Sequence, residues 1–89
     1  MQFKINNNGD TFDTLRHQLA YLRQAHTSMK WALADSAPHG RNYQTCADPA
    51  QCLAEDLQEW QHALEHLRSV HSYIESFEAQ LIQNKRSQS

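Results

Sequence analysis

Hydrophobic residues recur every three or four positions in each half of the chain, and a polar stretch separates the two halves. In the first half the repeat comprises Phe12, Leu15, Leu19, Leu22, His26, Met29 and Leu33. In the second half it comprises Leu53, Leu57, Trp60, Leu64, Leu67, His71 and Ile74. This spacing gathers the apolar side chains on one narrow face of an α-helix, as in helices that pack along another helix. The pattern therefore predicts an all-α fold, an antiparallel helical hairpin.

The first helix is expected at about residues 11–36. Asp10 or Thr11 can cap its N-terminus, because a short polar side chain at that position accepts a hydrogen bond from a free backbone amide. Pro38 ends the helix, since the residue before a proline is pushed out of the helical region. Residues 1–9 precede it as a flexible or extended arm.

The second helix is expected at about residues 49–83 and has a clear start. Asp48 stands at the N-cap, Pro49 at the first helical position and Gln51 at the third, which is a capping-box arrangement. No Gly or Pro follows to interrupt the helix. The polar tail at 84–89 is expected to be disordered.

The second helix is longer than the first by about two turns, at 1.5 Å per residue. If the two helices pair outward from the loop, Leu33 lies near Leu53 and the far end of the second helix overhangs. That end carries three apolar residues, Phe77, Leu81 and Ile82. Cover for them is expected from the arm, through Phe3 and Ile5, or from a second subunit.

A second apolar repeat adjoins the first on the second helix, formed by Ala63, Leu67, Val70, Ile74, Phe77 and Leu81. A helix with two adjoining apolar faces contacts two neighbours, one within its own hairpin and one outside it. A chain this small also tends to need a partner for stability. We therefore expect a homodimer that forms a four-helix bundle. Its expected contacts are Trp31, Leu67, Val70, Ile74, Phe77 and Leu81.

Length and charge narrow the class of protein. The 89 residues suffice for a single domain, residues 1–89, with a formal net charge of −2. Eight Lys and Arg residues are spread along the chain, whereas a nucleic-acid-binding surface is normally a clustered basic face. No apolar run is long enough to span a bilayer, and the first ten residues lack the apolar core of a signal peptide. A cytoplasmic protein without membrane contact is the simplest expectation.

A small nucleic-acid-binding regulator is an alternative, because three cations follow one another at seven-residue intervals, Arg16, Arg23 and Lys30. Such spacing places them on one side of the first helix, where they could form a stripe on a dimer. An alternative is that these cations simply lie on a solvent-exposed outer face of the helix. The net negative charge of the chain favours this interpretation.

The connection at residues 37–48 is long for a helical hairpin. Long ordered loops tend to carry function. We therefore predict that its side chains contact a protein partner, through His39, Arg41, Asn42 and Tyr43. The alternative is a loop that simply packs over the end of the bundle, with Tyr43 as its plug.

Six histidines are many for a chain of this length. His62 and His66 stand four residues apart, so both imidazoles can face one way and chelate a metal. A third ligand would have to come from Glu59, Glu65, His17 or another subunit. No second pair completes a known metal pattern of helical bundles. We therefore expect no metal and no cofactor, and no catalytic residue stands out.

His26 and His71 each occupy a position in an apolar repeat. A polar group at such a position can fix the register or the oligomeric state of packed helices. It can also make assembly sensitive to pH, because imidazole titrates near neutrality. The alternative is that each ring reaches the edge of the interface and hydrogen-bonds a neighbour.

Cys46 and Cys52 lie on either side of the start of the second helix, where the helix N-terminus favours a thiolate at Cys52. They could form a disulfide or bind zinc together with His39, which would make the chain a metal- or redox-responsive module. The third interpretation, two ordinary thiols, is favoured because free cysteine often behaves as a small hydrophobe.

The segment Ala37-Pro38-His39-Gly40-Arg41-Asn42-Tyr43, followed by a helix rich in Ala, Leu, Glu and His, resembles small uncharacterised proteins of proteobacterial phages and prophages. Those proteins carry a Pro-His-Gly-Arg-x-Tyr loop between two helices, and the cysteine pair is not part of their pattern. The resemblance covers about half the chain. It implies a phage accessory protein that acts by binding a host or phage protein, without enzymatic activity.

Overall fold

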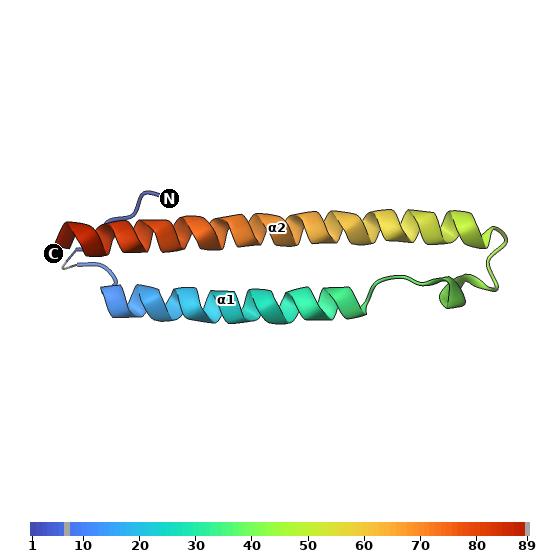
Figure 1. Cartoon of the computed structure of the whole chain (residues 1–89), viewed down its shortest axis with the longest axis horizontal. Coiled ribbons are helices and arrows are strands. Elements are labelled where there is room, and N and C mark those ends of the chain that lie inside the picture. The colour runs from blue at the N-terminus through green and yellow to red at the C-terminus, as the bar shows by residue number, and fades with distance from the viewer. Residues whose placement is uncertain (7, 89) are drawn as a thin grey trace.

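The computed structural model describes residues 1–6 and 8–88, and it shows a rod of 64 × 19 × 18 Å. Helix α1 spans Phe12–Asp35, a short 3₁₀ helix η1 spans Gly40–Tyr43, and helix α2 spans Pro49–Gln88. The two long helices lie side by side and antiparallel (Figure 1). The predicted all-α hairpin is thus confirmed.

Helix α1 begins and ends where the sequence predicts, within one residue. The Thr11 side chain caps it by accepting a hydrogen bond from the Thr14 amide at 3.1 Å. At the other end, the backbone amide of Ser36 donates to the carbonyls of Ala32 and Leu33. The Ser36 hydroxyl also donates to the Leu33 carbonyl, at 2.9 Å. Local capping chemistry therefore accounts for both ends of α1.

Helix α2 starts at the predicted N-cap, but only half of the capping box forms. Oδ1 of Asp48 accepts a hydrogen bond from the Gln51 amide at 3.2 Å. The side chain of Gln51 does not return to Asp48 and instead donates to Oε1 of Glu55 at 2.9 Å. One capping bond, together with Pro49 at the first position, is enough to start the helix.

The prediction of a disordered tail at residues 84–89 is wrong for residues 84–88, since α2 continues to Gln88; Ser89 lies outside the described residues. The physical reason is Asn84, whose side chain is 8% exposed although it is polar. Its amide group donates to the carbonyls of Gln80 and Phe3, so the residue ties the last turns of α2 to the N-terminal arm.

The register between the helices differs from the predicted one by about two turns. The indole Nε1 of Trp60 donates to the Leu33 carbonyl at 2.8 Å, so Leu33 faces Trp60 and not Leu53. Consequently the N-terminal end of α2, and not its C-terminal end, extends past α1. The loop and η1 run along that extension (Figure 1). The prediction paired the helices directly outward from the loop, whereas the loop follows α2 before α2 meets α1.

The hydrophobic core explains this register. Its fully buried members are one side chain of α1 and three of α2, namely Leu19, Ile74, Phe77 and Leu81. Partly buried residues pack around them, namely Phe3, Ile5, Phe12, Leu15 and Leu22. The most apolar stretch of α2 is thus placed opposite the apolar half of α1, because that arrangement removes the most hydrocarbon surface from water.

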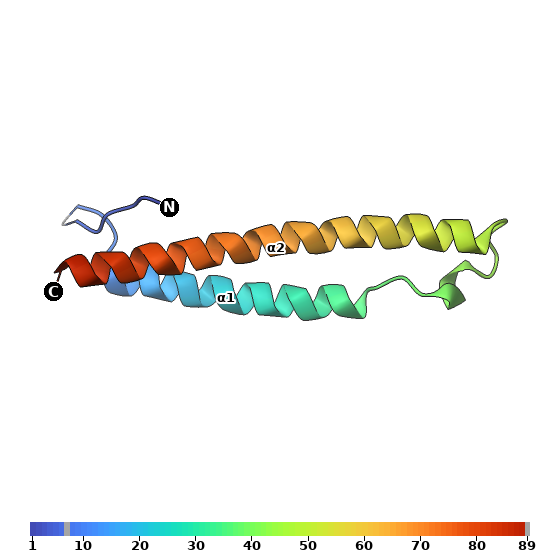
Figure 2. The same ribbon diagram turned by 45° about the horizontal axis from the view of Figure 1, so that its top comes forward.

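The N-terminal arm lies on the side of α2 that faces away from α1 (Figure 2). The carbonyl of Phe3 accepts hydrogen bonds from the side chains of Gln80 and Asn84, at 2.9 and 3.1 Å. The Ile5 amide donates to Oδ1 of Asn84 at 2.9 Å. The Phe3 ring also packs 5.5 Å from the Phe77 ring, centre to centre. Phe3 and Ile5 of the arm therefore pack against the core at this end of α2, whereas Ile82 stays 45% exposed.

Candidate functional surfaces

The loop predicted to bind a partner is anchored to α2 by Tyr43. The Tyr43 hydroxyl donates a hydrogen bond of 2.6 Å to Oδ2 of Asp56. This bond holds η1 against the N-terminal extension of α2, so Tyr43 acts much as the alternative plug would. His39, Arg41 and Asn42 remain exposed on the outer side of the loop. Of the four predicted partner contacts, these three are thus available and Tyr43 positions them.

The same hydrogen bond raises the pKa of Tyr43 to about 12, because Asp56 stabilises the protonated phenol and its charge opposes the phenolate. A pKa raised in the folded state contributes stability that is complete below the unfolded value of about 10 and is lost as the pH rises toward 12. We therefore expect the stability advantage of wild type over Tyr43→Phe to shrink between about pH 10 and about pH 12.

Denaturant unfolding of both proteins across this pH range measures that advantage. A constant difference would show that Tyr43 acts by packing alone. Tyr73→Phe serves as the matched control, because no hydrogen bond of the Tyr73 hydroxyl is present among the described residues.

The thiols of Cys46 and Cys52 lie close to each other at the start of α2, and both are free and half-buried. A hydrogen bond donated by the Cys52 thiol to Cys46 raises the pKa of Cys52, and so does burial of the thiol; the nearby charges of Glu55 and Asp48 raise it further. The predicted preference for a thiolate at Cys52 is therefore wrong. The hydrogen bond to Cys46 and the burial of the thiol, aided by the two carboxylates, outweigh the attraction of the helix dipole for an anion.

His62 and His66 are both exposed on α2. Within residues 1–6 and 8–88, no three His, Cys, Asp or Glu side chains are grouped closely enough to hold a metal ion. The ligands considered from sequence, Glu59, Glu65 and His17, thus do not join this pair. Nor does His39 complete a group with the two cysteines.

His26 and His71 meet across the interface between the helices. Their ring centres are 5.5 Å apart and the ring planes are inclined at 37°. Nε2 of His26 lies 3.3 Å from the Leu67 carbonyl, and Nε2 of His71 lies 3.5 Å from a carboxylate oxygen of Glu75. Each ring therefore has a polar neighbour, as the alternative interpretation holds, but the meeting of the two rings was not expected.

One groove between the helices is apolar and aromatic. It is a shallow cavity of about 600 Å³ lined by His17, Gln18, Tyr21, Leu22, Tyr73 and Phe77. Tyr21 is 77% exposed and Tyr73 is 53% exposed. Met29 lies two turns beyond Leu22, and Val70 lies one turn before Tyr73; both are exposed. We call the four exposed residues the aromatic face: Tyr21, Met29, Val70 and Tyr73.

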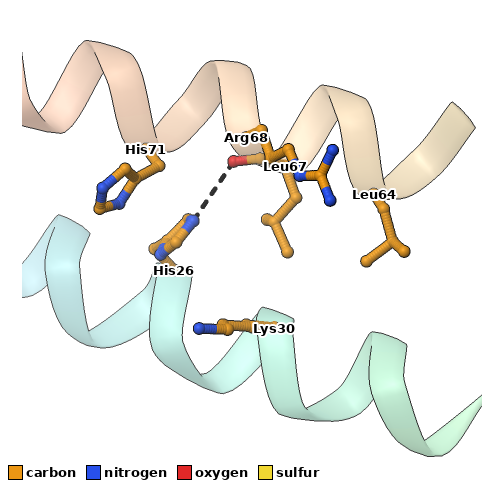
Figure 3. A pocket seen from close by; sticks show the side chains of 6 residues that line it. All are labelled: His26, Lys30, Leu64, Leu67, Arg68 and His71. Carbon is orange, nitrogen blue, oxygen red and sulfur yellow. Dashed lines mark hydrogen bonds between the residues drawn. The ribbon is translucent and has the colours of Figure 1, made fainter. Parts of the chain in front are cut away.

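The other groove carries positive charge. Arg23 contacts two carboxylates of α2, Glu75 at 3.7 Å and Glu78 through a short hydrogen bond. Lys30 and Arg68 line the same groove on opposite helices, and both lie on the loop side of the His26 and His71 rings (Figure 3). Of the seven-residue stripe, Arg16 also has a carboxylate partner, Asp13 at 3.4 Å. Two cations of the stripe are thus neutralised within the chain.

The residues predicted for the dimer interface are divided by the fold. Ile74, Phe77 and Leu81 lie in the core of the single chain, so they present little surface to a second subunit. Leu67 is half-buried against α1. Trp31 is exposed but lines the cationic groove with Arg23 and Lys30, and Val70 belongs to the aromatic face. Of the predicted set, Trp31 and Val70 therefore keep exposed surface, on different grooves.

Comparison with known proteins gives no relative: no family model, curated protein or solved structure matches the chain. In the part of the chain that the structure describes, neither long helix has a stretch apolar enough to cross a membrane. The chemistry of its surfaces is therefore the basis for any functional assignment.

Proposed function

We propose that this chain is a non-enzymatic protein-interaction module, in keeping with the phage and prophage proteins that its loop resembles. The aromatic face carries the proposal. Tyr and Met are enriched in the cores of protein interfaces, where large side chains give much contact area for little lost entropy. A monomer as thin as this rod buries only four hydrophobic side chains fully among its described residues. The exposed aromatic face supplies the apolar surface that a second copy can cover.

In this proposal two hairpins pair through their aromatic faces to form a four-helix bundle, and the loop end binds a host or phage protein. The loop suits that role because His39, Arg41 and Asn42 are exposed while Tyr43 anchors the loop to α2. Arg41 offers a fork of hydrogen-bond donors that matches a carboxylate or a backbone carbonyl. A dimer would present this loop twice, which strengthens binding to a repeated partner.

Light scattering coupled to size-exclusion chromatography tests the self-association. We expect wild type to have about twice the chain mass of 10.3 kDa, and Tyr73→Glu to elute as a monomer because it would bury an unpaired charge in the interface. The matched control is Trp31→Glu, which places the same charge on an exposed aromatic residue of the opposite groove and should leave the dimer intact.

A dimer that is lost with Trp31→Glu and kept with Tyr73→Glu would move the interface to the cationic groove. A monomeric wild type with native helicity would contradict self-association. In that case the aromatic face would remain as a surface for a different protein.

A further inference from the structure

The positively charged groove between α1 and α2 contains a pocket. Neither the packing of the helices nor the proposed function explains why cations and imidazoles gather there. The pocket has a volume of about 380 Å³ and is lined by His26, Lys30, Leu64, Leu67, Arg68 and His71. Every polar side chain in this lining is a cation or an imidazole, and no carboxylate is among them. The chain has a net charge of −2, so this pocket is a local excess of positive charge. Such a pocket favours a negatively charged ligand.

The two permanent cations of the pocket are not neutralised by the protein. Among residues 1–6 and 8–88, Arg16 and Arg23 form ion pairs, whereas neither Lys30 nor Arg68 belongs to one. They come from different helices, Lys30 from α1 and Arg68 from α2, and they border one opening (Figure 3). A bound anion would thus contact both helices at once.

The histidine pair forms the inner wall of the pocket. His26 and His71 also line a second cavity of about 330 Å³ together with Lys30 and Arg23, so a further cation lies near both rings. Charged groups near the rings are Arg23 and Lys30 on α1, and Arg68 and Glu75 on α2. Glu75 is the single carboxylate of this set, and it already bridges His71 and Arg23.

We propose that this pocket binds a small phosphate-bearing anion, of the size of a di- or polyphosphate. The guanidinium of Arg68 can donate two parallel hydrogen bonds to phosphate oxygens, and Lys30 adds a point charge. The imidazole N–H groups supply further donors, and they gain charge on protonation. The volume lies at the lower end of the range for small-ligand pockets, about 300–1,000 Å³. Several cations around one opening favour a multiply charged anion over a single carboxylate.

Nuclear magnetic resonance titration with pyrophosphate at low ionic strength tests the site. We expect saturable shifts of the His26 and His71 ring signals and of the Arg68 side chain, at concentrations below about 10 mM. Both Arg68→Gln and Lys30→Gln should weaken binding about tenfold or more. Both side chains are exposed, so the variants should keep the helicity of wild type.

Arg16→Gln is the matched control, because Arg16 is also a cation of α1 but lies outside the pocket and pairs with Asp13. It should bind pyrophosphate as wild type does. Equal weakening in Arg16→Gln would overturn the proposal, since it would indicate a general cationic surface. So would the absence of saturable shifts, or an equal response to matched potassium chloride.

Inorganic phosphate and duplex DNA distinguish the source of the phosphate group. Saturable binding of inorganic phosphate or pyrophosphate at these rings supports a small-anion site. Tighter binding of duplex DNA that is weakened in both Arg68→Gln and Lys30→Gln would overturn it, because the pocket would then belong to a nucleic-acid-binding surface.

Discussion

Ile74→Ala is expected to lower the free energy of unfolding by about 3 kcal/mol. Ile74 is 1% exposed, and it packs with Leu19, Phe77 and Leu81 in the centre of the core. Removing its outer carbons loses the free energy gained by burying them. It also leaves a cavity that the surrounding side chains fill only partly. Small single-core proteins have only a few kcal/mol to lose. Urea unfolding followed by circular dichroism should therefore show a variant that is largely unfolded without denaturant.

Ile82→Ala provides the matched control, because it removes the same atoms from the same helix. Ile82 is 45% exposed and lies outside the core. We expect a loss below about 1 kcal/mol from this variant. If the two variants were destabilised equally, the hydrophobic core would not lie where the structure places it. Proteins at several concentrations should be compared, so that dissociation of a dimer is separated from unfolding.

Asn84→Ala is expected to release the N-terminal arm and to cost about 1–3 kcal/mol. The Asn84 side chain accepts a hydrogen bond from the Ile5 amide and donates to the Phe3 carbonyl, so it is the main polar link between the arm and α2. Truncation leaves the Ile5 amide without its partner at a partly buried site. Hydrogen exchange at that amide should then become about tenfold faster or more.

The arm's release has a second consequence, because Phe3 covers Phe77. The ring contact between them should weaken in Asn84→Ala, and the Phe77 ring should become more exposed. Asn42→Ala is the control, since Asn42 is an exposed asparagine of the loop. Unchanged protection of the Ile5 amide in Asn84→Ala would show that the apolar contacts of Phe3 and Ile5 hold the arm by themselves.

The parts of the fold that the sequence predicts correctly are those that depend on nearby residues. Thr11 caps α1 and Asp48 caps α2 through bonds to amides three residues away. The spacing of apolar residues likewise indicates which face of each helix is buried. The register does not follow from local chemistry, because two regular apolar faces can slide past each other by whole turns. The register that forms is the one in which the core residues and the arm bury the most apolar surface.

The candidate sites depend on that register, which is why the sequence did not reveal them. Lys30 and Arg68 each look like ordinary solvent-facing cations beside an apolar repeat. They line the same pocket only because His26 lies opposite His71. Asn84 was missed for a similar reason, since a polar residue in a polar tail carries no sign that an arm from the far end of the chain will cover it.

The uneven placement of the core gives the rod two unlike halves. Its fully buried hydrophobic side chains, Leu19, Ile74, Phe77 and Leu81, lie near the arm. Toward the loop, half-buried side chains and single hydrogen bonds hold the segments together. Two such bonds run from Trp60 to Leu33 and from Tyr43 to Asp56. Local opening therefore costs least at the loop end. The helices can fray there while the arm end stays closed, so the loop end can adapt its shape to what it meets without loss of the fold.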